Sequence, residues 1–340
     1  MHLSTLDAQY RSLNRLLDGI LRVGQKLTIP KLILFDAAVN FYPAFYLIRG
    51  VILTKKFMFI FIVFSLLGLS ACNNDNKDQK KPSVSSHQTN RNVDKTRKSH
   101  YETMAQIRAE MINKYQKQIP KQWGENVTGV KTRLATQEKV IALTFDACGG
   151  KRGSGYDKKL IDFLEKQKVS ATLFINSRWI DSNKETFLSL AKNPLFEIEN
   201  HGLLHRPLSV TGKSVWGIKG TANANEVVSE VLESAEKIKK LTGRKPKFFR
   251  SGTAYYDDVA VKIVNDLGEQ PVNFNVLGDA GATYSAAQVK SALLSAKPGS
   301  IVICHMNQPI GETAEGVIQA ISLLKRNGYR FVKLEDYNLK

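Results

Sequence analysis

From residue 139 onward the sequence alternates between short apolar runs and longer amphipathic stretches, and this rhythm constrains the fold more than any other feature. The apolar runs predict strands at 140–145, 171–176, 196–200, 248–250, 272–276, 301–304 and 331–334. The amphipathic stretches predict helices at 158–168, 184–191, 225–241, 258–267, 286–295 and 313–326. Such alternation forms a parallel sheet covered by helices, so we expect an α/β fold, a distorted (β/α)7 barrel.

In barrels of this kind the chemistry lies beyond the carboxyl ends of the strands, which gives a test for every candidate residue. Several polar residues pass it. They are Asp146 in the segment T-F-D-A-C-G-G, His201 and His205 after the third predicted strand, Arg250 after the fourth, Asp279 after the fifth and His305 after the sixth.

These residue types suit hydrolysis of an amide. His201 and His205 are four residues apart directly after a strand, and a turn there can aim both imidazoles at one metal ion, although two histidines on a solvated loop are the plain alternative. A divalent metal lowers the pKa of its bound water from about 16 toward roughly 7. Asp146 can accept that water's proton, Arg250 can hold Asp146 ionised, and His305 can protonate the leaving nitrogen.

Taken together and in this order, the segments resemble the polysaccharide deacetylases, carbohydrate esterase family 4 with its NodB-homology domain, over roughly residues 139–334. The family's motifs read T-F-D-D, H-[ST]-x-x-H, R-x-P, a segment with Asp or Trp, and L-x-x-H. The resemblance implies a zinc, cobalt or nickel enzyme that deacetylates N-acetylated sugars of an envelope polysaccharide or peptidoglycan. It also implies roles for individual residues, namely His201 and His205 as metal ligands, Asp146 as general base, His305 as general acid, Arg250 as the group that orients the base and Asp279 as the group that tunes the acid.

The first motif departs from the family pattern at a metal ligand. Its second aspartate is Ala147 here, so another donor must complete the site. Asp146 is the favoured candidate because a metal-bound carboxylate can still accept a hydrogen bond from a neighbouring water. Cys148 as a thiolate and Glu199 as an extra carboxylate are the alternatives. The second motif carries Gly202 where Ser or Thr is usual, and the third lacks its proline.

The altered motifs keep two further functions open. One is hydrolysis of other non-peptide C–N bonds on the same barrel, and the other is a catalytically inactive, glycan-binding lipoprotein. Residues 208–223 read as a long loop on the catalytic face. Trp216 in that loop, together with Tyr255 and Tyr256 after the fourth predicted strand, are candidates for stacking on sugar rings.

A second resemblance lies upstream of the barrel. Lys55 and Lys56 precede an apolar run at 57–69 that is too short to span a bilayer comfortably, and Leu69-Ser70-Ala71-Cys72 resembles the lipobox of bacterial lipoproteins. We therefore predict an envelope protein, anchored by lipid on Cys72 at the periplasmic or outer-membrane face. A genuine internal signal anchor is the alternative.

This interpretation divides the chain into five parts. We expect residues 1–53 to be an upstream extension from a misassigned start codon, 54–71 a signal peptide and 72–99 a disordered tether. An N-terminal helix and a short hairpin should follow over 100–138, and the catalytic domain over 139–340.

The charge balance of the chain indicates an anionic partner. Its 49 Lys and Arg against 31 Asp and Glu give a formal net charge of +18. Much of the excess lies at 77–121 and on surface helices instead of in a basic patch interleaved with aromatic residues, which argues against nucleic acid. An acidic polymer or a membrane surface is the expected partner, besides the acetylated glycan substrate.

Overall fold

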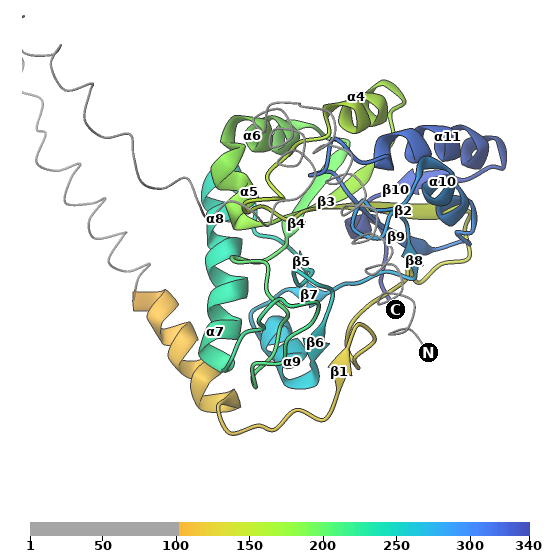
Figure 1. Ribbon diagram of the computed structural model, residues 1–340. Helices are drawn as coiled ribbons and strands as arrows, with labels where there is room; N and C mark the ends of the chain where they lie inside the picture. Colours follow the sequence, from red (N-terminus) through yellow and green to blue (C-terminus); the bar gives the residue numbers. More distant parts are fainter. Residues whose placement is uncertain (1–101) are drawn as a thin grey trace, which may run out of the picture. The chain divides into compact units, whose positions relative to one another are not determined.

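The structure is a computed structural model that describes residues 102–340, coloured by sequence in Figure 1. The predicted extension, the signal segment, the tether and Cys72 lie outside the described residues, so the lipoprotein interpretation stays a prediction. Among the helices of residues 102–340, none is both long enough and apolar enough to cross a membrane.

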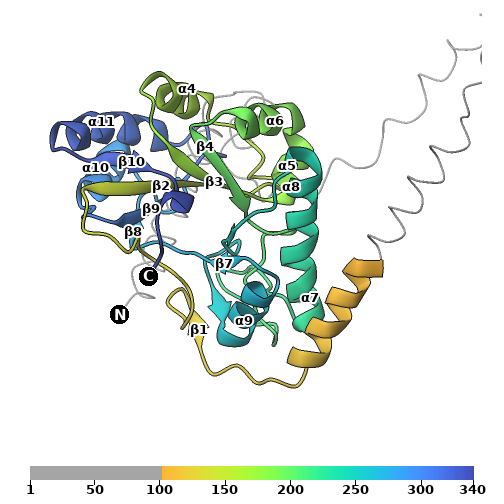
Figure 2. The same cartoon turned by 180° about the vertical axis from the view of Figure 1, so that it is seen from behind.

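A curled parallel sheet forms the centre of the fold (Figures 1 and 2). Its strands are β2 (Val140–Ala147), β3 (Ala171–Ile175), β4 (Phe196–Asn200), β5 (Phe248–Phe249), β7 (Gln270–Pro271), β8 (Val276–Leu277), β9 (Ser300–His305) and β10 (Arg330–Val332). Their order is β7-β5-β4-β3-β2-β9-β8, and β10 pairs with the first residues of β2. Because β7 and β8 stand at the two ends of this order, the sheet curls as a barrel that does not close. The predicted distorted α/β barrel is confirmed.

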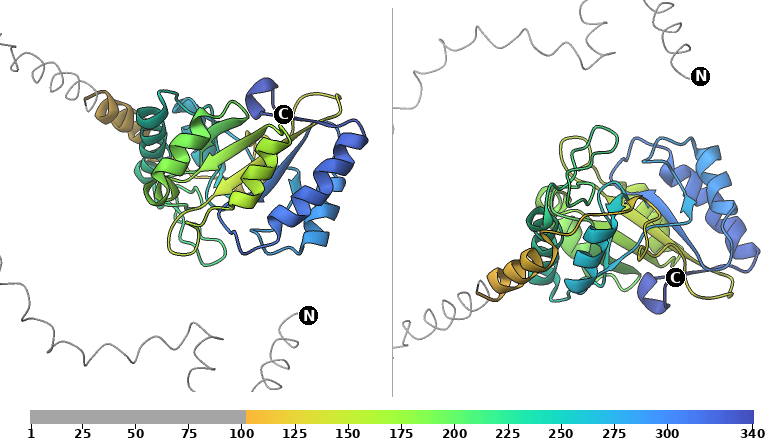
Figure 3. Two further views of the ribbon diagram at one scale, coloured as in Figure 1. Left: turned by 90° about the horizontal axis from the view of Figure 1, so that it is seen from above. Right: turned by 90° about the horizontal axis from the view of Figure 1, so that it is seen from below.

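Helices cover the outer face of the sheet. They are α4 (Lys158–Lys166), α5 (Ser177–Ser182), α6 (Lys184–Lys192), α7 (Ala224–Val228), α8 (Ser234–Thr242), α9 (Asp258–Asp266), α10 (Ala286–Leu294) and α11 (Thr313–Arg326). A π-helical segment, Ser229–Glu233, joins α7 to α8. Figure 3 shows the sheet between the α7–α8 stretch on one side and α10 and α11 on the other.

Alternation along the strands divides the core into two layers, because successive side chains of a strand point to opposite faces. The odd-numbered residues of β2 belong to an apolar layer between sheet and helices, and they are Ile141, Leu143, Phe145 and Ala147. Val140 and Ala142 face the other way, into a cluster inside the barrel together with Phe174 of β3 and Ile301 of β9. The interior of the barrel therefore receives the even-numbered residues of β2.

Two predicted elements are wrong, and some short elements, among them β6 (Tyr256–Asp257) and helix α5, were missed. The predicted strand at 272–276 is mostly the connection between β7 and β8. The predicted hairpin at 123–133 does not form, because β1 (Trp123–Gly124) pairs antiparallel with β6 instead. Helix α5 is too short to show a helical period, and the Asn176 side chain caps it by accepting a hydrogen bond from the Arg178 N–H at 3.1 Å.

Residues 102–138 pack on the barrel as part of one unit. Residues 102–115 are helical as predicted, and Met111 and Tyr115 lie buried in a cluster with α7 and α9. Further along, Lys131 N–H donates to Pro271 beside one end of the sheet, and Leu134 N–H donates to Gly299 beside β9. Leu134 is fully buried inside the barrel. The predicted domain boundary at 139 therefore cuts through a packed core.

Candidate metal and catalytic site

The predicted site residues meet at the carboxyl edge of the sheet. Asp146 lies near the end of β2 and His305 ends β9, and the strand register makes them direct neighbours. His201 follows β4, and Arg250 follows β5. Parallel strands thus bring together groups that are up to 159 positions apart in the chain, counting from Asp146 to His305.

A buried ion pair fixes Asp146. The Arg250 guanidinium donates to Asp146 Oδ1 at 2.7 Å and to Thr144 Oγ1 at 2.8 Å. It also donates to the carbonyls of Val272 and Asn273, at 3.2 and 3.1 Å, and its side chain is fully buried. Burial alone would raise the pKa of Asp146, but the charge of Arg250 and the nearby imidazoles hold it below its ordinary value. The ionised carboxylate is therefore the favoured form of Asp146.

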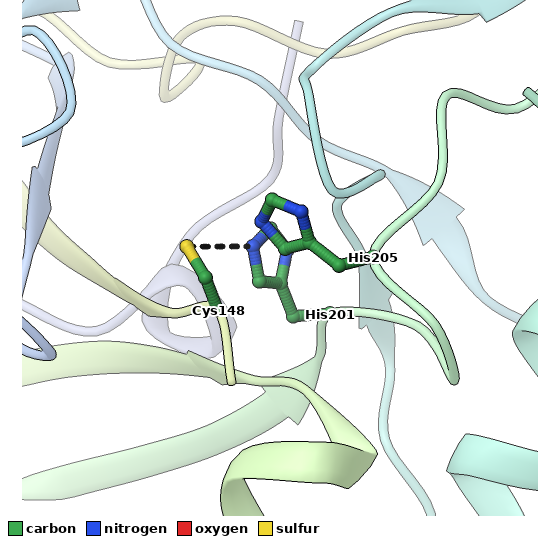
Figure 4. A group of neighbouring side chains, drawn as sticks. All are labelled: Cys148, His201 and His205. Atoms are coloured by element: carbon green, nitrogen blue, oxygen red, sulfur yellow. Dashed lines mark hydrogen bonds between the residues drawn. The ribbon is translucent and has the colours of Figure 1, made fainter. Parts of the chain in front are cut away.

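The two histidines of the second motif lie next to each other, and each has a ring nitrogen of the kind that binds metals. His201 Nδ1 lies 2.9 Å from the Arg250 carbonyl, and a carbonyl only accepts, so Nδ1 carries the hydrogen. When the ring is neutral, Nε2 carries the lone pair, and it faces Asp146 Oδ2 at 3.5 Å and Cys148 Sγ at 3.9 Å. The two rings are perpendicular, with centroids 4.9 Å apart (Figure 4). His205 Nε2 is buried and has no hydrogen-bond partner. A buried polar atom without a partner destabilises the folded state unless a ligand binds it.

A buried carboxylate from the π-helical segment holds the turn between these histidines. Glu230 accepts hydrogen bonds from the N–H groups of Leu204 and Arg206. Gly202 and His205 both have left-handed backbone, with φ of +81° and +61°. A Cβ at Gly202 would lie 2.5 Å from Glu230 Oε1, which explains why glycine replaces the usual Ser or Thr of this motif. Sequence reasoning missed Glu230 because no local pattern marks it.

His305 is paired with Asp279, as the sequence predicted. His305 Nδ1 lies 2.8 Å from Asp279 Oδ1, and the other oxygen of Asp279 accepts from the His305 N–H and from Thr313 Oγ1. Burial would lower the pKa of His305, but the Asp279 carboxylate raises it well above its ordinary value. The Asp279 carboxylate therefore favours the protonated imidazole of His305.

Cys148 completes a set of three metal-type donors. The ligand atoms of Cys148, His201 and His205 all lie within 4.8 Å of one another, with Sγ 3.9 Å from His201 Nε2 (Figure 4). Burial would raise the pKa of the Cys148 thiol, but the surrounding imidazoles bring it well below its ordinary value. Among the described residues, this is the one such group of three or more His, Cys, Asp or Glu side chains.

Of the remaining candidate residues, Glu199 and Tyr256 make structural contacts, whereas Trp216 lies at the surface. Glu199 does not join the donor set, because one of its oxygens accepts from the N–H groups of Lys247 and Phe248 at 2.8 and 2.7 Å. Tyr256 is fully buried and accepts from the Ser251 N–H, so it has a structural role. Tyr255 lies between the rings of Trp123 and Trp216, at 5.7 and 5.3 Å, and Trp216 is 68% exposed.

A buried carboxylate paired with arginine, an imidazole paired with aspartate and a set of nitrogen and sulfur donors meet at the carboxyl edge of a parallel barrel, an arrangement that suits metal-assisted hydrolysis. Sequence comparison agrees. Residues 133–272 match the family model for polysaccharide deacetylases.

Two curated relatives show the extent of the sequence similarity. The bifunctional xylanase/deacetylase of Pseudobutyrivibrio xylanivorans is 28% identical over 211 residues, which cover 62% of this chain and 32% of that protein. The peptidoglycan-N-acetylmuramic acid deacetylase PdaA of Bacillus subtilis is 25% identical over 209 residues, which cover 59% of this chain and 72% of that protein. The chain thus spans only about a third of the first relative.

Solved structures show the same fold. The solved structure of Bacillus subtilis PdaA, a family 4 carbohydrate esterase, superposes with a TM-score of 0.51 at 24% identity, over 67% of this chain and 87% of that one. A family 4 pseudoenzyme from Bacillus anthracis superposes with a TM-score of 0.52 at 21% identity, over 63% of this chain and 69% of that one. The fold is therefore shared by proteins with and without catalytic activity, and function must be argued from the site.

Proposed function

We propose that the chain is a metal-dependent hydrolase that removes acetyl groups from N-acetylated sugars of an envelope polysaccharide or peptidoglycan. The observation that carries this proposal is the convergence of the Asp146–Arg250 pair, the His305–Asp279 pair and the donor set on one edge of the sheet. A site with an ionised base and a protonated acid side by side serves hydrolysis, in which one proton is taken and one is given.

The residues fit a divalent metal. The buried, unpartnered Nε2 of His205 and the lone pair of His201 Nε2 are nitrogen donors that suit zinc or cobalt. His201 and His205 would hold the ion together with a third protein donor. When bound, a divalent metal supplies an activated water and a polarised carbonyl.

The side chains themselves move the protons. Asp146, kept ionised by Arg250, accepts the proton of the attacking water. His305, kept cationic by Asp279, gives its proton to the nitrogen that leaves as the sugar amine. Arg250 and Asp279 are positioning residues, because each acts through the group that it holds.

The rest of the chain is consistent with an envelope substrate. A net charge of +18 favours binding to anionic wall or capsule polymers. Lipid on Cys72 would hold the enzyme at the envelope, where such polymers occur. This anchoring remains part of the proposal, since Cys72 lies outside the described residues.

Peptidoglycan provides the test. Zinc-loaded protein is incubated with purified peptidoglycan and with N-acetylglucosamine oligomers, and the digested products are analysed by mass spectrometry. We expect deacetylated sugars with the wild type and none with Asp146→Asn. If neither glycan is deacetylated while another amide or cyclic C–N substrate in a panel is hydrolysed, the second candidate, favoured by the altered first and third motifs, replaces the first.

A further inference from the structure

We infer that Cys148 is the third protein ligand of the metal, so that the site is a Cys-His-His centre in which a thiolate takes over the role of the family's second aspartate. This inference rests on the proposed function only in expecting a metal at this place. It can be tested by metal binding alone.

The first argument is the direction of side chains along β2. Thr144 and Asp146 both contact the buried Arg250 guanidinium and therefore face the barrel interior. Ala147 belongs to the apolar layer on the opposite face, where its exposure is 0%. Cys148 is the next residue on the interior side of the alternation. Its thiol therefore points toward the histidines.

The turn that follows fixes this direction. Gly149 and Gly150 both have positive φ, at +70° and +79°. A Cβ at Gly149 would lie 2.5 Å from the backbone nitrogen of Trp179, so the turn packs tightly against α5. The Arg178 guanidinium also donates a hydrogen bond to the Cys148 carbonyl, at 3.4 Å. Contacts to the backbone of residues 148 and 149 thus hold the chain here, and they leave the Cys148 thiol free to face the site.

The second argument is distance. In a tetrahedral zinc site with ordinary bond lengths, sulfur and nitrogen donors stand about 3.4 to 3.6 Å apart. Cys148 Sγ and His201 Nε2 are 3.9 Å apart, and all pairs in the set lie within 4.8 Å. Shifts well within the range of side-chain rotation close the remaining gap.

The third argument concerns the competing donors, each of which already has a partner through at least one oxygen. Asp146 Oδ1 is bound by Arg250 at 2.7 Å, and although Asp146 Oδ2 lies 3.5 Å from His201 Nε2, Asp146 is not part of the set of donors within 4.8 Å of one another. Glu199 is bound to two backbone amides. Cys148 and Cys304 are both free thiols, and Cys304 packs in the apolar layer on the far face of β9. Assigning the metal to Cys148 leaves Asp146 free for proton transfer.

Cobalt substitution tests the inference directly, because a cobalt–thiolate bond gives an intense ultraviolet charge-transfer band that oxygen and nitrogen ligands do not. Metal-free full-length protein is titrated with Co²⁺. We expect the band to grow to one equivalent in the wild type. It should vanish in Cys148→Ala, with metal affinity lowered by at least tenfold, and persist in the matched controls Cys304→Ala and Cys72→Ala.

A second variant guards against misfolding of Cys148→Ala. Cys148→Asp offers an oxygen donor at the same place, so we expect it to bind Co²⁺ without the band, with a circular dichroism spectrum like that of the wild type. A wild-type cobalt complex that depends on His201 but shows no band would overturn the inference. A band without deacetylation would leave it standing and refute the proposed function, whereas deacetylation without a band would do the reverse.

Discussion

Arg250 shows how much of the site depends on single side chains. Its guanidinium bonds Asp146, Thr144 and two carbonyls, and it stacks on the ring of Phe174 at 4.0 Å. A buried ion pair contributes little net stability, but removing one partner leaves an unpaired buried charge at a cost of about 3–5 kcal/mol. The same contacts keep Asp146 ionised. Structure and chemistry at this residue therefore cannot be separated by mutation, and a better test of the mechanism lies at Asp279.

Asp279→Asn removes the negative charge beside His305. Asparagine keeps nearly the same shape and can still accept from the His305 N–H and Thr313, but it no longer favours the imidazolium. Because Asp279 raises the pKa of His305, its removal lowers that pKa, and the proton donor is lost at a lower pH. We expect kcat to fall on the order of 100-fold and the alkaline limb of the pH–rate profile to move to lower pH.

The measurement is a pH–rate profile of acetate release, with metal content determined on the same samples. Metal binding should be unchanged, since Asp279 contacts none of the three metal-type donors among its hydrogen bonds in the described structure. An unchanged profile would show that His305 is not the proton donor.

At the scale of elements, the π-helical segment between α7 and α8 has a specific use. Insertions of this kind often mark functional sites. Here the segment carries Glu230, whose carboxylate binds the backbone between His201 and His205. The turn is strained at His205, so it needs such a brace to keep both imidazoles in place.

We therefore expect Glu230→Ala to weaken zinc affinity by about 10- to 100-fold, the usual effect of losing an outer contact of a metal site. Glu233→Ala is the matched control. Glu233 belongs to the same segment, but it is exposed and pairs with Arg108. Competition with a chromogenic chelator measures both variants, and equal affinities would refute a positioning role for Glu230.

Elements also show what the sequence can and cannot predict. The convergence of Asp146, Arg250 and His305 follows from alternation alone, because the carboxyl ends of parallel strands share one edge. Alternation along β2 also directs Cys148 toward the barrel interior, although sequence reasoning gave Cys148 only as an alternative ligand. The hairpin prediction failed because the partner of Trp123 and Gly124 is a distant segment, Tyr256–Asp257, which the local sequence does not indicate. Glu230 was beyond sequence reasoning, since its contact depends on a helical insertion and on a turn 26 residues away.

At the scale of the folded unit, residues 102–138 contribute to the core. Leu134 fills the barrel interior, and Met111 and Tyr115 pack on α7 and α9. Removing these side chains exposes apolar core surface to water, which costs roughly 25 cal/mol of folding free energy per Å². It also opens the end of the barrel. We expect a protein that starts at residue 139 to unfold at least 10 °C below one that starts at residue 102, or not to fold. Calorimetry measures the melting temperatures of the two proteins. Equal temperatures would show that residues 102–138 do not stabilise the domain and that its boundary lies at 139.

The central claim is that this site hydrolyses the acetyl–nitrogen bond of a sugar. The most direct measurement is the amount of acetate and of free amine released from N-acetylglucosamine oligomers by zinc-loaded wild type and His305→Gln. We predict equal amounts of both products with the wild type and a large loss of both with the variant at unchanged metal content. A wild type that holds one equivalent of metal and releases neither product from any N-acetylated glycan would contradict the account and indicate a binding protein.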